Sequence, residues 1–287
     1  MLALQLLVDG LINGCVLGTI SISFALIYST TRMFHVAHAG VFTLGAYFVW
    51  TFIQAGIPGP GAVALGMACC MAVGAGIQRY LYQPLAARNA TLLVSMIASL
   101  GLLAIIENGI AAVYSQNVLT FPDWWGTDVV RIAGLPITAA QILSIVMGLG
   151  AYAFLMVLSR RTLLGRKIRA VASNPFLAEI GQVKPKTVYI WIYAIGSMIV
   201  CLPSALIAAE FGLRPYNGLL YLINASIAMI ASGLGSITGA FVVSILLAVL
   251  QNMSLLVVPS QWSIGVTFVL FILLMLFRPR GLFVSAR

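Results

Sequence analysis

The chain has 287 residues, of which 62% are hydrophobic and 7% are charged, and its formal net charge is +9. Soluble domains usually carry roughly 25% charged residues, so this composition, with a mean hydropathy of +1.09, excludes a soluble globular protein. The positive charge does not indicate nucleic-acid binding, because the basic residues are confined to the loops and flanks of apolar segments and form no soluble basic face.

Apolar runs of about 20 residues, the length of a membrane-spanning helix, follow one another along the chain. The first four are predicted at about 2–28, 36–55, 62–80 and 92–114. The first run carries Gly10, Gly14 and Gly18 at four-residue spacing. This spacing places the glycines on one helical face and favours close packing against a second helix.

A loop poor in lysine follows at 115–136, and its Asp123, Asp128 and paired tryptophans are typical of an external loop. Five further apolar runs lie at about 137–158, 188–208, 219–231, 240–257 and 263–277. The pattern predicts an all-α integral membrane protein, a polytopic helical bundle of about eight or nine transmembrane segments with broken helices. We interpret residues 1–287 as a single transmembrane domain, with an external N-terminus and a cytoplasmic C-terminus.

The loop at about 160–186 between the fifth and sixth runs is rich in cations. It holds seven of the fifteen basic residues: Arg160, Arg161, Arg166, Lys167, Arg169, Lys184 and Lys186. Cation-rich loops between spanning helices belong on the cytoplasmic side. Two roles fit such a loop: it forms a contact surface for a cytoplasmic partner, or it lies as an amphipathic segment on anionic lipid headgroups.

Two stretches of small or polar residues interrupt the apolar runs, at 35–40 and at 232–239. Paired broken helices often line the pathway of a transporter, because unwound backbone is tolerated at membrane depth only where it lines a cavity or is covered by protein. Tight hairpins between ordinary helices explain the same pattern equally well.

Few polar side chains lie within the apolar runs, and such groups are often functional. Asp9 and Glu107 are close enough to the outer ends of their segments to reach water or headgroups, and Gln251 is interpreted as an interhelical hydrogen-bonding group. The candidates for a translocation path are Asn13, His35, His38, Glu107, Asn108, Asn224, Ser232 and Gly233. The sequence shows no nucleophile with a base, no metal-binding cluster and no nucleotide-binding motif, so an enzyme or a protein with its own cofactor or metal is not expected.

Four patches of sequence resemble a known family. They are Arg32–Tyr47 (RMFHVAHAGVFTLGAY), Ile97–Leu102 with Glu107 and Asn108, Leu164–Pro175 with Ala178 and Glu179, and Gly233–Ala240 followed by Arg278–Phe283. In this order and over essentially the full length, the chain resembles the LivH-type inner-membrane permeases of branched-chain amino acid ABC importers.

The resemblance implies an importer of two permease subunits, two cytoplasmic ATPases that bind ATP–Mg, and a periplasmic solute-binding protein, in the bacterial inner membrane. The second permease would be a related subunit, giving a heterodimer. The cation-rich loop would dock on the ATPase through short helices, with Ile168, Val171, Phe176 and Ile180 as its apolar contact. The coupling residues that the resemblance implies are Gly165, Arg166, Arg169, Ala170, Asn174, Pro175, Glu179 and Gly181.

Departures from the family pattern leave the solute open. His35 replaces the usual Asn, Ala39-Gly40 replaces a Gly followed by a polar or acidic residue, and Glu107 stands where Gln is common. The segment 179–186 is about one residue short, and its Pro185 is unusual there. An amino acid is the favoured solute, with urea, amides and small carboxylates as alternatives. An ion-coupled secondary carrier is less favoured, because it needs a clearly central carboxylate with a partner.

Overall fold

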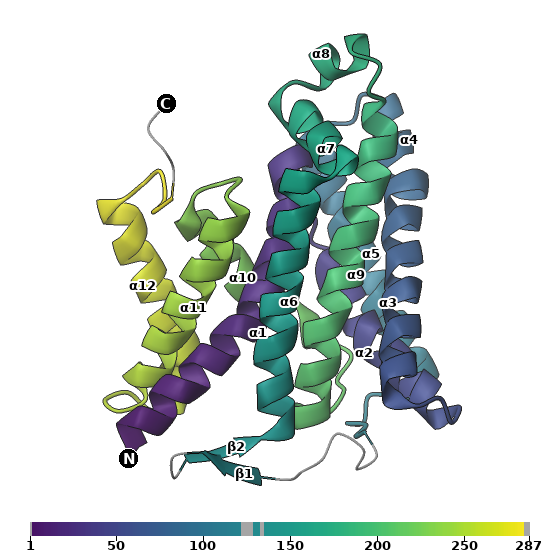
Figure 1. Ribbon diagram of the computed structural model, residues 1–287. Coiled ribbons are helices and arrows are strands. Elements are labelled where there is room, and N and C mark those ends of the chain that lie inside the picture. The colour runs from purple at the N-terminus through teal and green to yellow at the C-terminus, as the bar shows by residue number, and fades with distance from the viewer. Residues whose placement is uncertain (1, 122–128, 133–134, 284–287) are drawn as a thin grey trace.

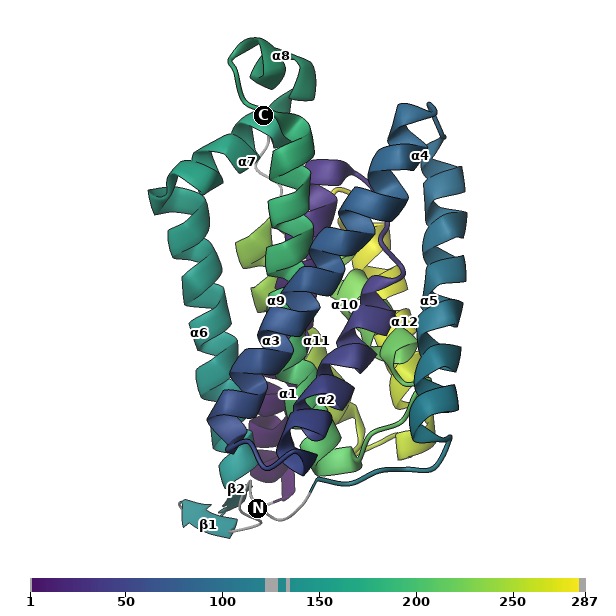
Figure 2. The same ribbon diagram turned by 90° about the vertical axis from the view of Figure 1, so that its right-hand side faces the viewer.

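The computed structural model describes residues 2–121, 129–132 and 135–283. Within these residues, the nine longest α-helices form an upright bundle (Figures 1 and 2). They are α1 (Leu2–Thr31), α2 (His38–Gln54), α3 (Gly59–Gly76), α5 (Leu92–Tyr114), α6 (Ala139–Arg161), α9 (Pro185–Phe211), α10 (Gly218–Ser232), α11 (Ile237–Ser254) and α12 (Ser263–Phe277). The all-α membrane architecture expected from the sequence is therefore present.

Seven of the described helical spans are long and apolar enough to cross a membrane. Among the remaining helices, α2 and α10 match the second and seventh apolar runs, but they have only 17 and 15 residues. At 1.5 Å per residue, each is shorter than the roughly 30 Å hydrocarbon core. The count of eight or nine crossings therefore stays a prediction.

Shorter elements lie at the two ends of the bundle. The π-helix η1 (Ile77–Tyr82), α4 (Gln83–Ala87), α7 (Leu163–Ser173) and α8 (Pro175–Ile180) gather at one end, which we call the α8 end (Figure 1). At the other end, which we call the hairpin end, β1 (Val129–Ile132) pairs antiparallel with β2 (Leu135–Thr138), and the 3₁₀ helix η2 (Ser260–Trp262) precedes α12. The hairpin was not expected from the sequence, and Asp123, Asp128 and the paired tryptophans of the same loop lie outside the described residues.

The centre of the bundle is formed by α1 and α9. Within their most apolar windows, 78% and 72% of the residues are buried, compared with 17% for α5 and 6% for the corresponding span of α12. The close packing expected for the first run is confirmed on α11. A Cβ atom added at Gly10 would lie 2.7 Å from Val249 Cα, and one added at Gly14 would lie 2.6 Å from Ile245 Cα. Only glycine allows the two backbones to approach this closely.

Positive charge gathers at the α8 end of the bundle. Twelve of the fifteen basic residues are described there: Arg32, Arg79, Arg88, Arg160, Arg161, Arg166, Lys167, Arg169, Lys184, Lys186, Arg278 and Arg280. Arg131 and Arg214 belong to the hairpin end, and Arg287 lies outside the described residues. The first helix begins at the hairpin end and the last helix finishes toward the α8 end (Figure 1). The two ends of the bundle therefore differ in charge, and the α8 end is the more positive.

Candidate solute cavity and coupling surface

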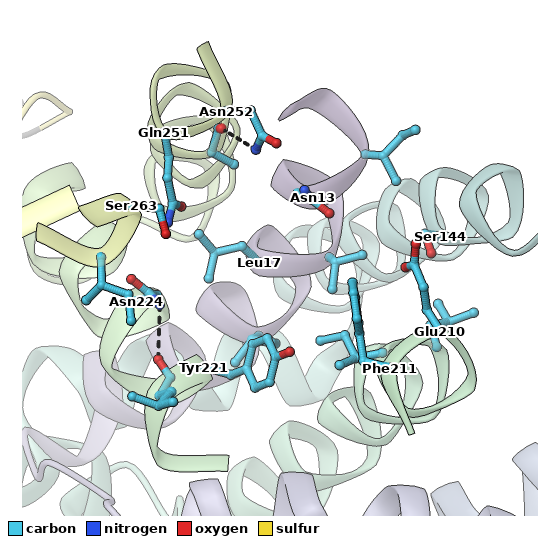
Figure 3. A pocket seen from close by; sticks show the side chains of 18 of the residues that line it. Asn13, Leu17, Ser144, Glu210, Phe211, Tyr221, Asn224, Gln251, Asn252 and Ser263 are labelled. Atoms are coloured by element: carbon cyan, nitrogen blue, oxygen red, sulfur yellow. Dashed lines mark hydrogen bonds between the residues drawn. The ribbon is translucent and has the colours of Figure 1, made fainter. Parts of the chain in front are cut away.

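A cavity of about 470 Å³ lies in the half of the bundle nearest the hairpin end. Its walls come from α1, α6, α9, α10, α11 and the start of α12 (Figure 3). The polar residues that line it are Asn13, Ser144, Glu210, Asn217, Tyr221, Asn224, Gln251, Asn252, Ser260 and Ser263. Cavities of roughly 300–1,000 Å³ hold small molecules in proteins, so the volume suits a small solute.

Amides and hydroxyls dominate the polar lining, and aliphatic side chains complete it. Asn224 Nδ2 donates to the carbonyl of Leu220 at 3.1 Å, while its Oδ1 has no partner among the described residues. Leu17 and Ile20 of α1 supply apolar surface between the polar groups. Among the lining residues, all of them in the described part of the chain, Glu210 is the one that carries a formal charge.

Two of the path candidates from the sequence, Asn13 and Asn224, line this cavity. Glu107 and Asn108 do not: they lie on α5, which contributes no residue to the lining. Asn108 Nδ2 donates to the carbonyl of Ala104 at 2.8 Å, and its Oδ1 accepts from Tyr216 Oη at 3.3 Å. Glu107 and Asn108 are therefore not part of this cavity, and their place in a translocation path stays a prediction.

His35 and His38 lie between the cavity and the α8 end, and both are fully buried. Residues 32–37 form the non-helical connection between α1 and α2, which begins at His38. Of the break predicted at 35–40, only residues 35–37 are therefore unwound. His35 Nδ1 lies 2.7 Å from Tyr82 Oη, and Tyr82 Oη donates to Ser99 Oγ at 2.9 Å. These side chains join the connection before α2 to η1 and α5 rather than line open space.

The second predicted break, at 232–239, is a hairpin turn between α10 and α11. Ser232 is fully buried, and its hydroxyl donates to the carbonyl of Met229 at 2.7 Å. The C-terminal segment covers the turn, because Leu282 N donates to the carbonyl of Ala231 at 3.0 Å and Phe283 N to the carbonyl of Ser232 at 2.9 Å. Ser232 and Gly233 therefore do not line the cavity, and the hairpin interpretation is the one that the structure supports.

The predicted short helices of the cation-rich loop are present as α7 and α8. The side chain of Thr162 accepts from Gly165 N at 3.0 Å and so caps α7. Asn174 Oδ1 accepts from the backbone nitrogens of Phe176 and Leu177 and caps α8, with Pro175 in its first turn. Side-chain oxygens at these positions satisfy donors that a helix leaves free.

The eight coupling candidates occupy two environments. Gly165 is buried where α7 meets the end of α6, so a side chain there would collide with the backbone of Leu158 and Ser159. The other seven are exposed: Arg166, Arg169, Ala170, Asn174, Pro175, Glu179 and Gly181. Arg169 Nη1 donates to the carbonyl of Ser159 and fastens α7 to α6.

One expectation for this surface is wrong. Ile168 and Val171 are 6% and 0% exposed and pack into the protein's own core, so they are not available to a partner. Their periodicity places them on the face of α7 that meets α1, α6 and α9. Phe176, Leu177 and Ile180 of α8 are instead 71%, 61% and 67% exposed. Leu163 at the start of α7 is 67% exposed as well. The exposed apolar groups of this loop therefore lie on α8 and at the start of α7.

Several cavity residues were missed from the sequence. Glu210 follows the apolar run predicted at 188–208 and was not among the path candidates, whereas the structure places it within the last turn of α9. Gln251 was interpreted as an interhelical group, and Asn217, Tyr221 and Ser263 were not considered. A signal was present: Asn217, Tyr221 and Asn224 follow one another at i, i+4 and i+7, which is one face of a helix.

Comparisons with known proteins agree with this architecture. The family described as "Branched-chain amino acid transport system / permease component" matches residues 6–275. The high-affinity branched-chain amino acid transport system permease protein BraD of Pseudomonas aeruginosa PAO1 is 27% identical, over 97% of this chain and 95% of its own. The corresponding LivH proteins of Escherichia coli K12 and Salmonella typhimurium LT2 are 23% and 24% identical, each over 97% of this chain and 94% of its own.

A solved structure also shares the fold. PsaBC from Streptococcus pneumoniae, in complex with a Fab, aligns with a TM-score of 0.52 over 95% of this chain and 91% of that chain. The two sequences are 12% identical, so this likeness concerns the fold alone.

Proposed function

The chain belongs to the family of branched-chain amino acid transport permeases, and from this premise we propose that it is the membrane-spanning subunit of an importer that moves a small amino acid inward with ATP hydrolysed by separate subunits. Its relatives are transport permeases, and they match it over nearly their whole length. The observation that carries the proposal is the arrangement of two surfaces at opposite ends of one bundle: a solute-sized polar cavity and an exposed apolar helix.

The α8 end is the cytoplasmic end in this proposal. Lys and Arg are enriched on the cytoplasmic side of membrane proteins, and twelve of fifteen basic residues lie at the α8 end. The N-terminus is then periplasmic and the C-terminus cytoplasmic, in the inner membrane. The cavity lies in the periplasmic half, where a solute arrives.

Coupling follows from how α7 and α8 are attached. Ile168 and Val171 anchor α7 to the bundle, and Arg169 fastens it to α6. Phe176, Leu177 and Ile180 project from α8 into solvent. A conformational change in an ATPase bound to α8 would therefore move α7. Because α7 packs directly on the cavity helices α1, α6 and α9, the movement would reach the cavity. Exposed apolar groups rimmed by charge are typical of an interaction surface.

The other subunits of the proposed importer are separate chains. Two ATPase subunits would bind ATP–Mg, a second and related permease would complete a heterodimer, and a periplasmic binding protein would deliver the solute. The chain itself would hold no metal or cofactor and catalyse no reaction. Its 1–287 span would act as one transmembrane domain.

A mild-detergent pull-down of the tagged chain tests the proposal. The expected result is co-purification of two ATPase subunits and a second permease, and ATP-dependent uptake after reconstitution with the binding protein. Recovery of the chain alone in several detergents, with uptake that does not need ATP, would refute the proposed importer.

A further inference from the structure

The cavity carries a single formal charge, and that charge is negative. Glu210 lines it, and its other lining residues are neutral amides, hydroxyls, aromatic and aliphatic groups in the described part of the chain. Arg214, the nearest cation along the chain, does not line the cavity but lines a small adjoining pocket that shares Ile207, Asn217 and Tyr221 with it. We propose that this cavity is a solute site within the permease itself, that Glu210 holds the ammonium group of its solute, and that the site rejects net anions.

The arrangement of polar groups fits a solute with two polar ends. Figure 3 shows Glu210 beside Ser144 on one side of the cavity and Gln251, Ser263 and Asn224 on the other, with Leu17 between them. Glu210 is acceptor-only when ionised and suits an ammonium, whereas the amide of Gln251 and the hydroxyl of Ser263 can donate to a carboxylate. The aliphatic surface of Leu17 and Ile20 can face an apolar side chain.

The charge balance decides which solutes are accepted. Inside a bundle the effective dielectric constant is far below that of water, so like charges repel more strongly there than in solution. A dicarboxylate would meet Glu210 and find no lining cation to offset it, since the described lining holds none. A zwitterion enters with no net charge and replaces the water around Glu210 with a charge-assisted hydrogen bond, which is stronger than a neutral one.

This inference rests on the proposed importer but makes a narrower claim. A binding protein alone could select the solute, and the permease could then be an unselective channel. The structure points instead to a second selection step inside the permease. Substitutions in this chain test that step, because they leave the binding protein unchanged.

The experiment uses the complex purified from its native membrane and reconstituted into proteoliposomes with its ATPases and binding protein. Uptake is measured for a mixture of radiolabelled L-amino acids, for urea and for succinate. We expect ATP-driven uptake of amino acids alone. Glu210→Gln, which keeps the shape and removes the charge, should lower that uptake about tenfold, the loss of one charge-assisted hydrogen bond. Glu210→Asp should recover part of it.

Glu107→Gln is the matched control, because Glu107 is an acid in the same half of the bundle that does not line the cavity. Its uptake should stay within about twofold of the wild type, as is usual for surface charges. Basal ATPase activity and complex assembly check that each variant folds. ATP-driven import of urea or succinate alone, or equal uptake by Glu210→Gln and Glu107→Gln, would overturn this inference while leaving the importer intact. A complex without ATP-driven uptake of any probe would overturn both.

Discussion

Ser21 Oγ donates a hydrogen bond of 3.0 Å to the carbonyl of Ala225, and so joins α1 to α10 immediately beyond the cavity. Ile20 and Asn224, the residues just before them, are the last lining residues of their helices on the way to the α8 end. Two residues further along α1, Ser23 Oγ lies 2.9 Å from His38 Nε2. Two fully buried interhelical contacts therefore close the cavity toward the α8 end.

The contact between Ser23 and His38 should contribute measurably to stability. Ser23→Ala removes the partner of a fully buried imidazole, whose Nδ1 already has no partner among the described residues. We expect the variant to lose about 1 kcal/mol, in the range of interhelical hydrogen bonds in membranes. Thermal unfolding in detergent measures the loss. Ser29→Ala is the control, because Ser29 bonds only to the carbonyl of Leu26 on its own helix, and an equal loss there would contradict the role of His38.

The spacing of α1 and α11 should depend on glycine. Gly14→Ala places a methyl group 2.6 Å from Ile245 Cα, and overpacking of this kind costs about 1–3 kcal/mol. Gly101→Ala is the matched control on α5, since nothing lies within 4 Å of a Cβ there. Gly101→Ala should be neutral or should stabilise the protein by about 0.5–1 kcal/mol, because glycine loses more conformational freedom than alanine when a helix folds. Thermal unfolding in detergent measures the stability of both variants. A Gly14→Ala variant as stable as Gly101→Ala would contradict the close contact between α1 and α11.

The exposed face of α8 should be needed to bind the ATPase. Ile180→Asp adds a charge to a side chain that is 67% exposed, so it should leave the fold intact and weaken an apolar contact by an amount typical of interface hot spots, about 2 kcal/mol. Co-purification of the ATPase measures the effect. Val257→Asp is the control at the opposite end of the bundle, where Val257 is 88% exposed. If both variants co-purify equal amounts of the ATPase, the exposed face of α8 is not the ATPase-binding surface.

Arg169 should transmit movement without being needed for docking. Arg169→Ala removes the hydrogen bond to the carbonyl of Ser159 and loosens α7 from α6. We expect the variant to keep membrane insertion and ATPase capture but to lose ATP-driven uptake. Lys167→Ala is the control, because Lys167 is exposed on the same helix, is not a coupling candidate and shows no side-chain hydrogen bond among the described residues. Normal uptake by Arg169→Ala would remove Arg169 from the coupling pathway.

The apolar core of α7 should be structural. Val171 is fully buried, and Val171→Asp would place a carboxylate in an apolar contact, which costs several kcal/mol. We expect this variant to lose both assembly and thermal stability. Lys167→Asp, an exposed position on the same helix, should retain both. A stable Val171→Asp variant would restore the original expectation that Val171 faces a partner.

Much of the fold was fixed by local chemistry. Long apolar runs must hydrogen-bond their own backbone in lipid, so each became a helix close to its predicted bounds. The glycine face of the first run also predicted its close contact, because a missing side chain has the same consequence wherever the partner helix lies. The two short helices after α6 were expected only from the family resemblance, and in the structure Thr162 and Asn174 cap them within one turn.

The cavity could not be predicted in the same way. Its polar groups come from six helices far apart in the chain, and whether Glu107 or Glu210 faces them depends on how each helix is placed and rotated in the bundle. An apolar run in a membrane is apolar on every side, so its sequence gives little information on rotation. The sequence by itself therefore determined the helices and their approximate bounds. Only tertiary packing decided that Glu210 lines the cavity with Asn13 and Asn224, that α5 contributes nothing to it, and that the core side of α7 is buried.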